Sequence, residues 1–126
     1  MIERVLKGND IYFRLIILGG DINDGKTEIY ITDVKGKTKV DFAPEILYDD
    51  NDRKISYATF QLKGINQSLG TLKIDVYQTV ANYNRRYVAN NVIEFVDNPE
   101  NVTSPDNIIN ECEVRFSGLR AQVQCT

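Results

Sequence analysis

Residue types able to perform acid–base, nucleophilic or metal chemistry are few in this chain of 126 residues, which has no histidine and no tryptophan. Histidine is the most common general base near neutral pH and the most common metal ligand. Its absence excludes a Ser-His-Asp triad, a Cys-His dyad and a zinc finger within this chain. Eighteen Asp and Glu residues make chance carboxylate pairs inevitable, but no pair is singled out for glycoside hydrolysis. We therefore expect no catalytic residue and no enzyme.

The two cysteines, Cys112 and Cys125, both lie near the C-terminus. Without further Cys or His ligands they do not form a zinc site. They could pair with each other, pair between chains, or stay reduced. Because disulfide-stabilised domains usually carry more cysteines, we expect two reduced thiols.

Two acidic loops are rich in the oxygen ligands that Ca²⁺ takes. The first, Asp49-Asp50-Asn51-Asp52, lacks the spaced order of a calcium loop and its downstream Glu. The second, Asp21-Ile22-Asn23-Asp24-Gly25, is one residue short of the same order. We interpret both as solvated turns and expect no metal and no cofactor.

Tyrosines are candidates for a contact surface, because each offers an apolar face with a polar tip. Tyr77, Tyr83 and Tyr87, together with Tyr12 and Tyr30, could line a carbohydrate-binding or protein-binding face. The competing interpretation is ordinary packing between neighbouring strands, which the sequence favours.

The charge of the chain is nearly balanced, with fifteen Lys and Arg against eighteen Asp and Glu and a net charge of −3. Nucleic-acid binding as the main task is disfavoured, because it needs a basic footprint. The basic cluster Lys35-Gly36-Lys37-Thr38-Lys39 is interpreted as a solvated hairpin tip. The start of the chain has no apolar signal core, and the longest apolar run, Leu15 to Leu18, is too short for a membrane span. We expect synthesis in the cytoplasm and no membrane partner.

Strands must position these residues, because Ile and Val together number twenty-five and Leu and Ala thirteen. Apolar and polar residues alternate along several short runs, and no amphipathic helix of convincing length is present. Residues 28–34 and 37–42 flank Lys35-Gly36 and predict a tight hairpin. The pattern predicts an all-β chain, an immunoglobulin-like antiparallel β-sandwich of about seven strands. The expected strands are 11–18, 28–34, 37–42, 55–62, 71–77 and 86–96.

Composition changes after residue 97, so we expect a β-sandwich over 1–97, a linker over 98–110 and an extended tail over 111–126. The linker contains two of the three prolines. The tail has alternating apolar residues that predict a docking strand pair, which needs a surface on its own sandwich or on a neighbouring subunit. The expected assembly residues are Cys112, Val114, Phe116, Leu119, Ala121 and Val123.

Three short motifs carry a resemblance to a known class of domain. They are Val5-Leu6-Lys7-Gly8-Asn9-Asp10-Ile11 before an apolar strand, Gly70-Thr71-Leu72-Lys73-Ile74-Asp75-Val76, and Asn91-Val92-Ile93-Glu94-Phe95-Val96-Asp97. Residues 1–97 thereby resemble the N-terminal immunoglobulin-like domain of phage fibre and baseplate-upper-type proteins, including those of gut Bacteroides and crAss-like phages. The chain lacks the D-L-T-like element usual after the first strand, unless Asp21-Ile22-Asn23 replaces it, and it has no long fibre shaft.

This resemblance implies a structural protein of the phage virion. Such domains anchor a fibre or appendage to the head or tail, or decorate the capsid, usually as homo-oligomers in contact with capsid, tail or fibre subunits. Under this hypothesis residues 112–123 dock on a neighbour by strand addition. The alternative is a carbohydrate-binding β-sandwich module with an exposed tyrosine face.

Overall fold

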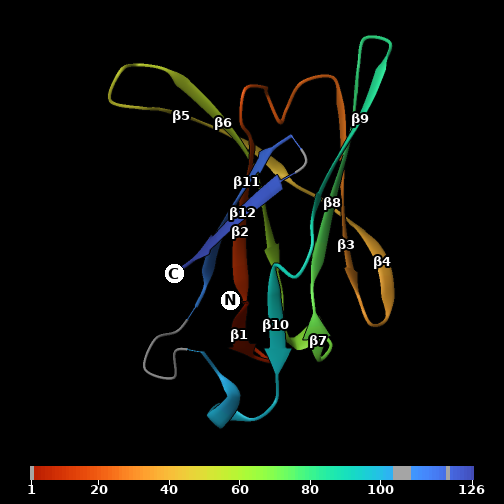
Figure 1. Cartoon of the computed structure of the whole chain (residues 1–126), viewed down its shortest axis with the longest axis vertical. Helices are drawn as coiled ribbons and strands as arrows, with labels where there is room; N and C mark the ends of the chain where they lie inside the picture. Colours follow the sequence, from red (N-terminus) through yellow and green to blue (C-terminus); the bar gives the residue numbers. More distant parts are fainter. Residues whose placement is uncertain (1, 104–108, 119) are drawn as a thin grey trace.

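Alternation of apolar and polar residues produces an all-β chain, as the sequence predicts (Figure 1). The computed structural model describes residues 2–103, 109–118 and 120–126. This part of the chain has twelve strands, more than the seven or so expected, and no α-helix. The described residues therefore contain no helix that could span a membrane. The strands are β1 (Glu3–Leu6), β2 (Ile11–Ile17), β3 (Lys26–Asp33), β4 (Gly36–Val40), β5 (Ala43–Tyr48), β6 (Lys54–Leu62), β7 (Gly70–Thr71), β8 (Lys73–Val80), β9 (Tyr83–Ala89), β10 (Ile93–Val96), β11 (Glu111–Ser117) and β12 (Arg120–Cys125).

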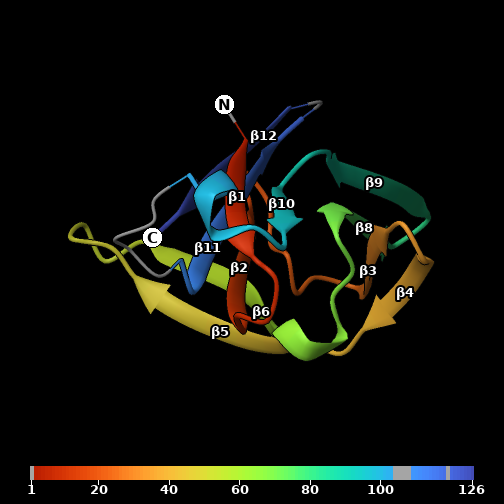
Figure 2. The same cartoon turned by 90° about the horizontal axis from the view of Figure 1, so that it is seen from below.

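The strands form three sheets. A five-stranded sheet has the order β12-β11-β2-β6-β5, and a four-stranded sheet has the order β4-β3-β8-β9. Figure 2 shows these two sheets on opposite sides of the molecule. The third sheet, β1-β10-β7, lies at the lower end of the view in Figure 1. The arrangement is therefore sandwich-like, with an additional small sheet at one end.

The core lies between the apolar faces of the two larger sheets. β2 shows the underlying pattern, because its odd-numbered residues are buried and its even-numbered residues are partly exposed. The ring of Phe13 on β2 stacks on Phe60 of the neighbouring β6, with centroids 5.1 Å apart. Across the sandwich, the ring of Phe116 on β11 lies 5.9 Å from that of Tyr87 on β9. Aromatic pairs of this kind join strands within a sheet and the two sheets to each other.

The surface that residues 111–126 need is supplied by their own chain. β11 pairs in parallel with β2 over six residue pairs, and β12 pairs antiparallel with β11. Val114 and Phe116 are essentially inaccessible to solvent. β11 is therefore an interior strand of the five-stranded sheet, paired on both sides with strands of its own chain.

The expectation of two reduced thiols is wrong. Cys112 and Cys125 are directly opposite each other in the β11–β12 register, with Cα atoms 4.1 Å apart, and they form a disulfide. The hairpin that brings them together depends on strand pairing, so the number of cysteines in the chain did not reveal it.

The strand expected over residues 86–96 is two strands in different sheets. Asn91 adopts a positive φ of 51° between β9 and β10, which redirects the chain. β9 joins the four-stranded sheet, whereas β10 joins β1 and β7. Asparagine tolerates this left-handed conformation better than most residues, which explains where the break falls.

The expected linker begins with ordered contacts. A short 3₁₀ turn, η2 (Pro99–Asn101), follows β10, and a second one, η1 (Gly64–Asn66), follows β6. Beyond η2, the backbone N–H of Arg4 donates to Oγ1 of Thr103 at 2.7 Å, and the N–H of Thr103 donates to the carbonyl of Arg4 at 3.1 Å. Ile109 belongs to the buried core. Residues 104–108 of the expected linker lie outside the described residues.

Candidate functional site

The predicted contact face of Tyr77, Tyr83 and Tyr87 is not brought together by the sheet. Tyr87 is opposite Val76 in the β8–β9 register, and Tyr83 is opposite Val80, whereas Tyr77 is opposite Arg86. Since opposite residues share a face, Tyr83 and Tyr87 lie on the inner side of the four-stranded sheet and Tyr77 on its outer side. Tyr12 is on β2 of the five-stranded sheet, so it belongs to neither face of the four-stranded sheet.

Tyr77 instead meets Tyr30 of β3 on a surface that we call the cationic tyrosine face. The two rings are edge to face, with centroids 5.5 Å apart. Strand register places five cationic and two acidic side chains on this outer face, although the whole chain is negative. The face consists of Lys26, Glu28, Tyr30, Lys37, Lys39, Lys73, Asp75, Tyr77, Thr79 and Arg86.

Lys37 is at the centre of the polar contacts on this face. Its ammonium group lies 4.8 Å from the ring centroid of Tyr30 and 4.5 Å from that of Tyr77. It also donates a hydrogen bond of 2.8 Å to the Tyr77 hydroxyl. The guanidinium carbon of Arg86 approaches the same Tyr77 ring from β9 at 5.4 Å. Cation–π contacts of this geometry hold charged groups over aromatic rings without neutralising them.

The two carboxylates of the face are both engaged by neighbours. Glu28 accepts a 2.6 Å hydrogen bond from the Tyr30 hydroxyl and is 3.2 Å from the ammonium of Lys26. The Tyr30 hydrogen bond, supported by Lys26 and by the charge of Lys39, lowers the pKa of Glu28, and the same hydrogen bond raises the pKa of Tyr30. Glu28 is therefore ionised at neutral pH and Tyr30 is protonated.

Asp75 is the buried carboxylate of the face, with 1% of its side chain exposed. Nε and Nη2 of Arg86 both donate to its Oδ1, at 3.0 and 2.8 Å. The pairing raises the pKa of Arg86. A buried carboxylate needs such a partner, so Arg86 has a structural task in addition to its contact with Tyr77.

Tyr30 is among the residues predicted from the sequence as candidates for a contact face. Lys37 and Arg86 are not among those candidates. Lys37 and Lys39 were interpreted as solvated hairpin residues, and both are indeed exposed. The available signal was their alternation: residues 37 and 39 are two apart on one strand of a hairpin whose other strand carries Tyr30. The contact with Tyr77, which comes from β8, needs the strand order as well.

A second exposed feature is the β5 arm, which we define as the projecting part of the β5–β6 hairpin with Ile46, Leu47 and Tyr48. Figure 1 shows this hairpin extending away from the rest of the sheet. The three side chains are 49%, 39% and 69% exposed. They point alternately to the two faces of the ribbon, so neither face is covered. A groove of about 260 Å³, lined by Leu18, Ile55 and Arg115 among others, lies beside the start of β6.

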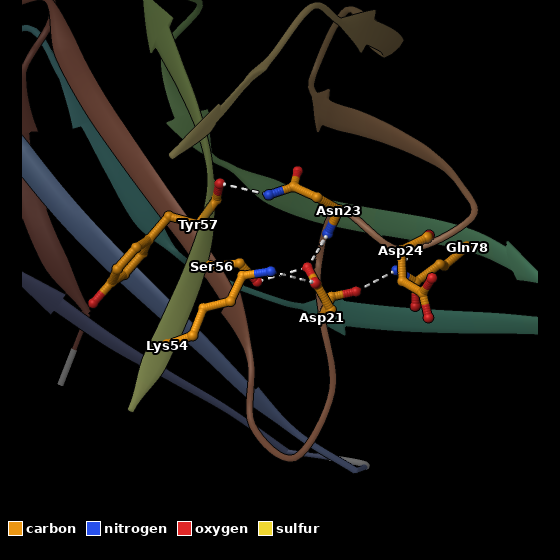
Figure 3. Close-up of polar contacts among 7 residues, drawn as sticks. All are labelled: Asp21, Asn23, Asp24, Lys54, Ser56, Tyr57 and Gln78. Carbon is orange, nitrogen blue, oxygen red and sulfur yellow. Dashed lines mark hydrogen bonds and ion pairs between the residues drawn. The ribbon is translucent and has the colours of Figure 1, made fainter. Parts of the chain in front are cut away.

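The loop over residues 21–25 is a structural corner. Oδ1 of Asp21 accepts hydrogen bonds from the Asn23 N–H at 2.9 Å and the Ser56 hydroxyl at 2.7 Å (Figure 3). Both contacts lower the pKa of Asp21, the one with Ser56 most strongly. Buried Gln78 donates from Nε2 to the carbonyls of Asp21 and Asp24, at 2.8 and 3.1 Å. Oδ1 of Asp21 and the carbonyls of Asp21 and Asp24 thus receive protein hydrogen bonds that hold the turn, whereas the buried Oδ1 of Asn23 has no partner among the described residues.

The other acidic loop is held in the same manner. Oδ1 of Asp49 accepts from the backbone N–H groups of Asn51 and Arg53, at 2.9 and 2.8 Å. The Arg53 guanidinium is 2.9 Å from Oδ2, and the pKa of Asp49 is lowered, mainly by the backbone hydrogen bond from Arg53. Among residues 2–103, 109–118 and 120–126, no group of three or more Asp, Glu, Cys or His side chains has metal-binding geometry.

The expected assembly residues are divided between the core and its margin. Cys112, Val114 and Phe116 are buried, while Ala121 and Val123 are partly buried against the core. Leu119 lies outside the described residues. The five described side chains thus pack in or against the core of their own chain. The β5 arm and the cationic tyrosine face are the two exposed surfaces that we consider as contact surfaces.

Comparison with known protein families, curated proteins and solved structures finds no match to this chain.

Proposed function

We propose that this chain is a non-catalytic structural protein of a phage virion, which decorates the capsid or anchors a fibre or appendage to head or tail. Its architecture would be a variant of the immunoglobulin-like sandwich, extended by the small β1-β10-β7 sheet and by the β11–β12 hairpin. The proposal is supported by the resemblance of residues 1–97 to the phage domains described above and by the all-β, sandwich-like fold.

The observation that carries the assembly role is the β5 arm. A two-stranded ribbon with apolar side chains on both faces is marginally stable in water, and a partner would cover it. β5 is also the edge strand of the five-stranded sheet, so its outer backbone groups are open to strand addition. We therefore assign assembly to the β5 arm in place of the β11–β12 hairpin.

The partner that we propose first is a second copy of the chain, in a homo-oligomer that other virion proteins then contact. The edge sequence itself favours specific assembly over indiscriminate stacking. Pro44 lacks a backbone donor, and Glu45 adds a charge beside the apolar residues. Such features limit continuous edge-to-edge pairing while leaving residues 46–48 available for contact.

Sedimentation velocity tests this role on the purified chain. The wild type is expected to form a defined oligomer, and the variant I46K/L47K is expected to be monomeric, because two charges replace apolar contacts. V34K is the matched control, since Val34 is 73% exposed in the β3–β4 turn, outside the arm. A monomeric wild type, or an oligomer that survives I46K/L47K, contradicts assembly through the arm. Flanking capsid, portal or fibre genes would independently support the virion role.

The cationic tyrosine face favours a second function, carbohydrate binding, which was the alternative from the sequence. The residues of this face differ from those expected. Tyr77 lies with Tyr30 and several cationic residues, and not with Tyr83 and Tyr87.

A further inference from the structure

We propose that the cationic tyrosine face binds an acidic saccharide, with one carboxylate of the sugar held by the ammonium group of Lys37. This inference is independent of assembly through the β5 arm, which belongs to the other sheet.

Lys37 is distinguished by the lack of a carboxylate partner. The other four cations of the face are shared between two carboxylates: Lys26 and Lys39 contact Glu28, and Lys73 and Arg86 contact Asp75. Within the described part of the chain, no carboxylate oxygen lies within 4.0 Å of the Lys37 ammonium. Its position is nevertheless fixed by two rings and one hydroxyl. A positioned cation that contacts no carboxylate is a binding group for one anion.

The groups around Lys37 suit sugar hydroxyls. A hollow of about 400 Å³ is lined by Lys26, Glu28, Tyr30, Lys37, Tyr77 and Thr79. This volume is in the range of small-ligand sites. The ionised Glu28 is an acceptor for hydroxyl protons. The Tyr77 hydroxyl accepts from Lys37 and donates to no acceptor among the described residues, so its proton remains available for a ligand.

The same groups disfavour a nucleic-acid strand. Such a strand presents a phosphate at every nucleotide and is bound by several cations along a groove. Here only Lys37 lacks a carboxylate contact among the cations of the face, and the Glu28 carboxylate in the hollow would repel a second nearby phosphate. A saccharide with well-separated carboxylates fits the hollow better. Its hydroxyl groups can donate hydrogen bonds to Glu28, while a single carboxylate binds Lys37.

Isothermal titration with a short hyaluronan oligosaccharide, which carries one carboxylate per disaccharide, tests the proposal. A neutral chitin oligosaccharide, heparin and an oligothymidine serve as comparison ligands. Lys37→Met is the decisive variant and Lys37→Arg retains the charge. Lys35→Met is the matched control, because Lys35 is an exposed lysine in the turn beside the face. Thermal unfolding of each variant verifies that the fold is kept.

We expect hyaluronan to bind the wild type, and K37M to weaken binding about tenfold or more, which is the usual effect of losing a charge-assisted hydrogen bond. K37R should recover part of the affinity, and K35M should stay within about twofold of the wild type, as for an exposed charge off the site. The neutral oligosaccharide should bind about tenfold more weakly than hyaluronan.

Three results would overturn the proposal: no hyaluronan binding, equal losses in K37M and K35M, or tighter binding of oligothymidine or heparin than of hyaluronan. Titrating the I46K/L47K variant separates the two functions. Retained saccharide binding in a monomeric variant supports both roles independently, whereas its loss would show that the saccharide site depends on assembly and would contradict the site as described.

Discussion

Replacing Phe116 with alanine is expected to destabilise the chain as strongly as replacing Phe60. Phe116 is on β11, in the segment that sequence reasoning placed outside the domain, and Phe60 is on β6, in its centre. Their exposed fractions are 1% and 5%. Each ring contacts another aromatic ring, Tyr87 for Phe116 and Phe13 for Phe60. The structure thus gives the two side chains equivalent core positions.

The magnitude follows from removing a buried aromatic side chain. A Phe→Ala change in a core costs about 3–5 kcal/mol, which combines the lost transfer free energy with the cavity left behind. Small domains unfold with roughly 5–15 kcal/mol, so such a loss is a large part of the total. Phe116→Leu removes fewer carbon atoms and is expected to cost roughly 1–2 kcal/mol, which keeps the measurement possible if the alanine variant does not fold.

Urea unfolding followed by circular dichroism, with the disulfide oxidised in every sample, measures these differences. The two alanine variants should show similar losses in the free energy of unfolding. Arg115→Ala, half exposed on the same strand, should stay within about 1 kcal/mol of the wild type. If F116A were as stable as the wild type while F60A lost 3–5 kcal/mol as estimated for a core phenylalanine, β11 would not be a core strand and the reasoning would fail.

Reducing the Cys112–Cys125 disulfide, which spans 13 residues, is expected to lower the free energy of unfolding by about 3 kcal/mol through the entropy of the unfolded chain. Urea unfolding with and without a phosphine reductant measures this, and C112S/C125S should be insensitive to the reductant; equal stability with and without the bond would contradict it. The folded-state pKa of Asp21 lies below its usual value of 3.8. The charged carboxylate therefore stabilises the folded chain fully at pH values above 3.8. This contribution is lost as the pH falls through the folded-state pKa. The stability advantage of the wild type over D21N, about 0.5–1 kcal/mol at neutral pH after solvent screening, should shrink as the pH falls from about 5 through the folded-state pKa of Asp21. An advantage that is constant over this range would show that the charge of Asp21 is not involved.

Local sequence patterns predicted strand positions well where one face of the strand is buried. The alternation at residues 11–17 corresponds to β2, and the expected hairpin is β3–β4, although its turn is Val34-Lys35, one residue before the expected Lys35-Gly36. β5 was missed, because most of its residues are exposed on both faces and give no alternation. A pattern that reflects burial cannot reveal a strand that is not buried.

The pairing of strands with one another could not be predicted from the sequence. Alternation in residues 111–117 is equally compatible with pairing inside the chain or on a neighbour, and only the observed register with β2 distinguishes them. The same limit applies to the cationic tyrosine face. Lys37, Tyr30 and Tyr77 come from three strands, and their meeting depends on the order β4-β3-β8.

The parallel pairing of β2 with β11 has a consequence for how the chain folds. Residues near 12–17 must find partners near 111–116, almost the whole chain length away. Contacts of such long sequence separation slow folding, because chain closure precedes any gain from pairing. During synthesis, one edge of β2 stays unpaired until β11 emerges from the ribosome, and the inner face of β2 is apolar. Pairing of the β11–β12 hairpin therefore completes the five-stranded sheet, and chains interrupted before it would expose an aggregation-prone strand.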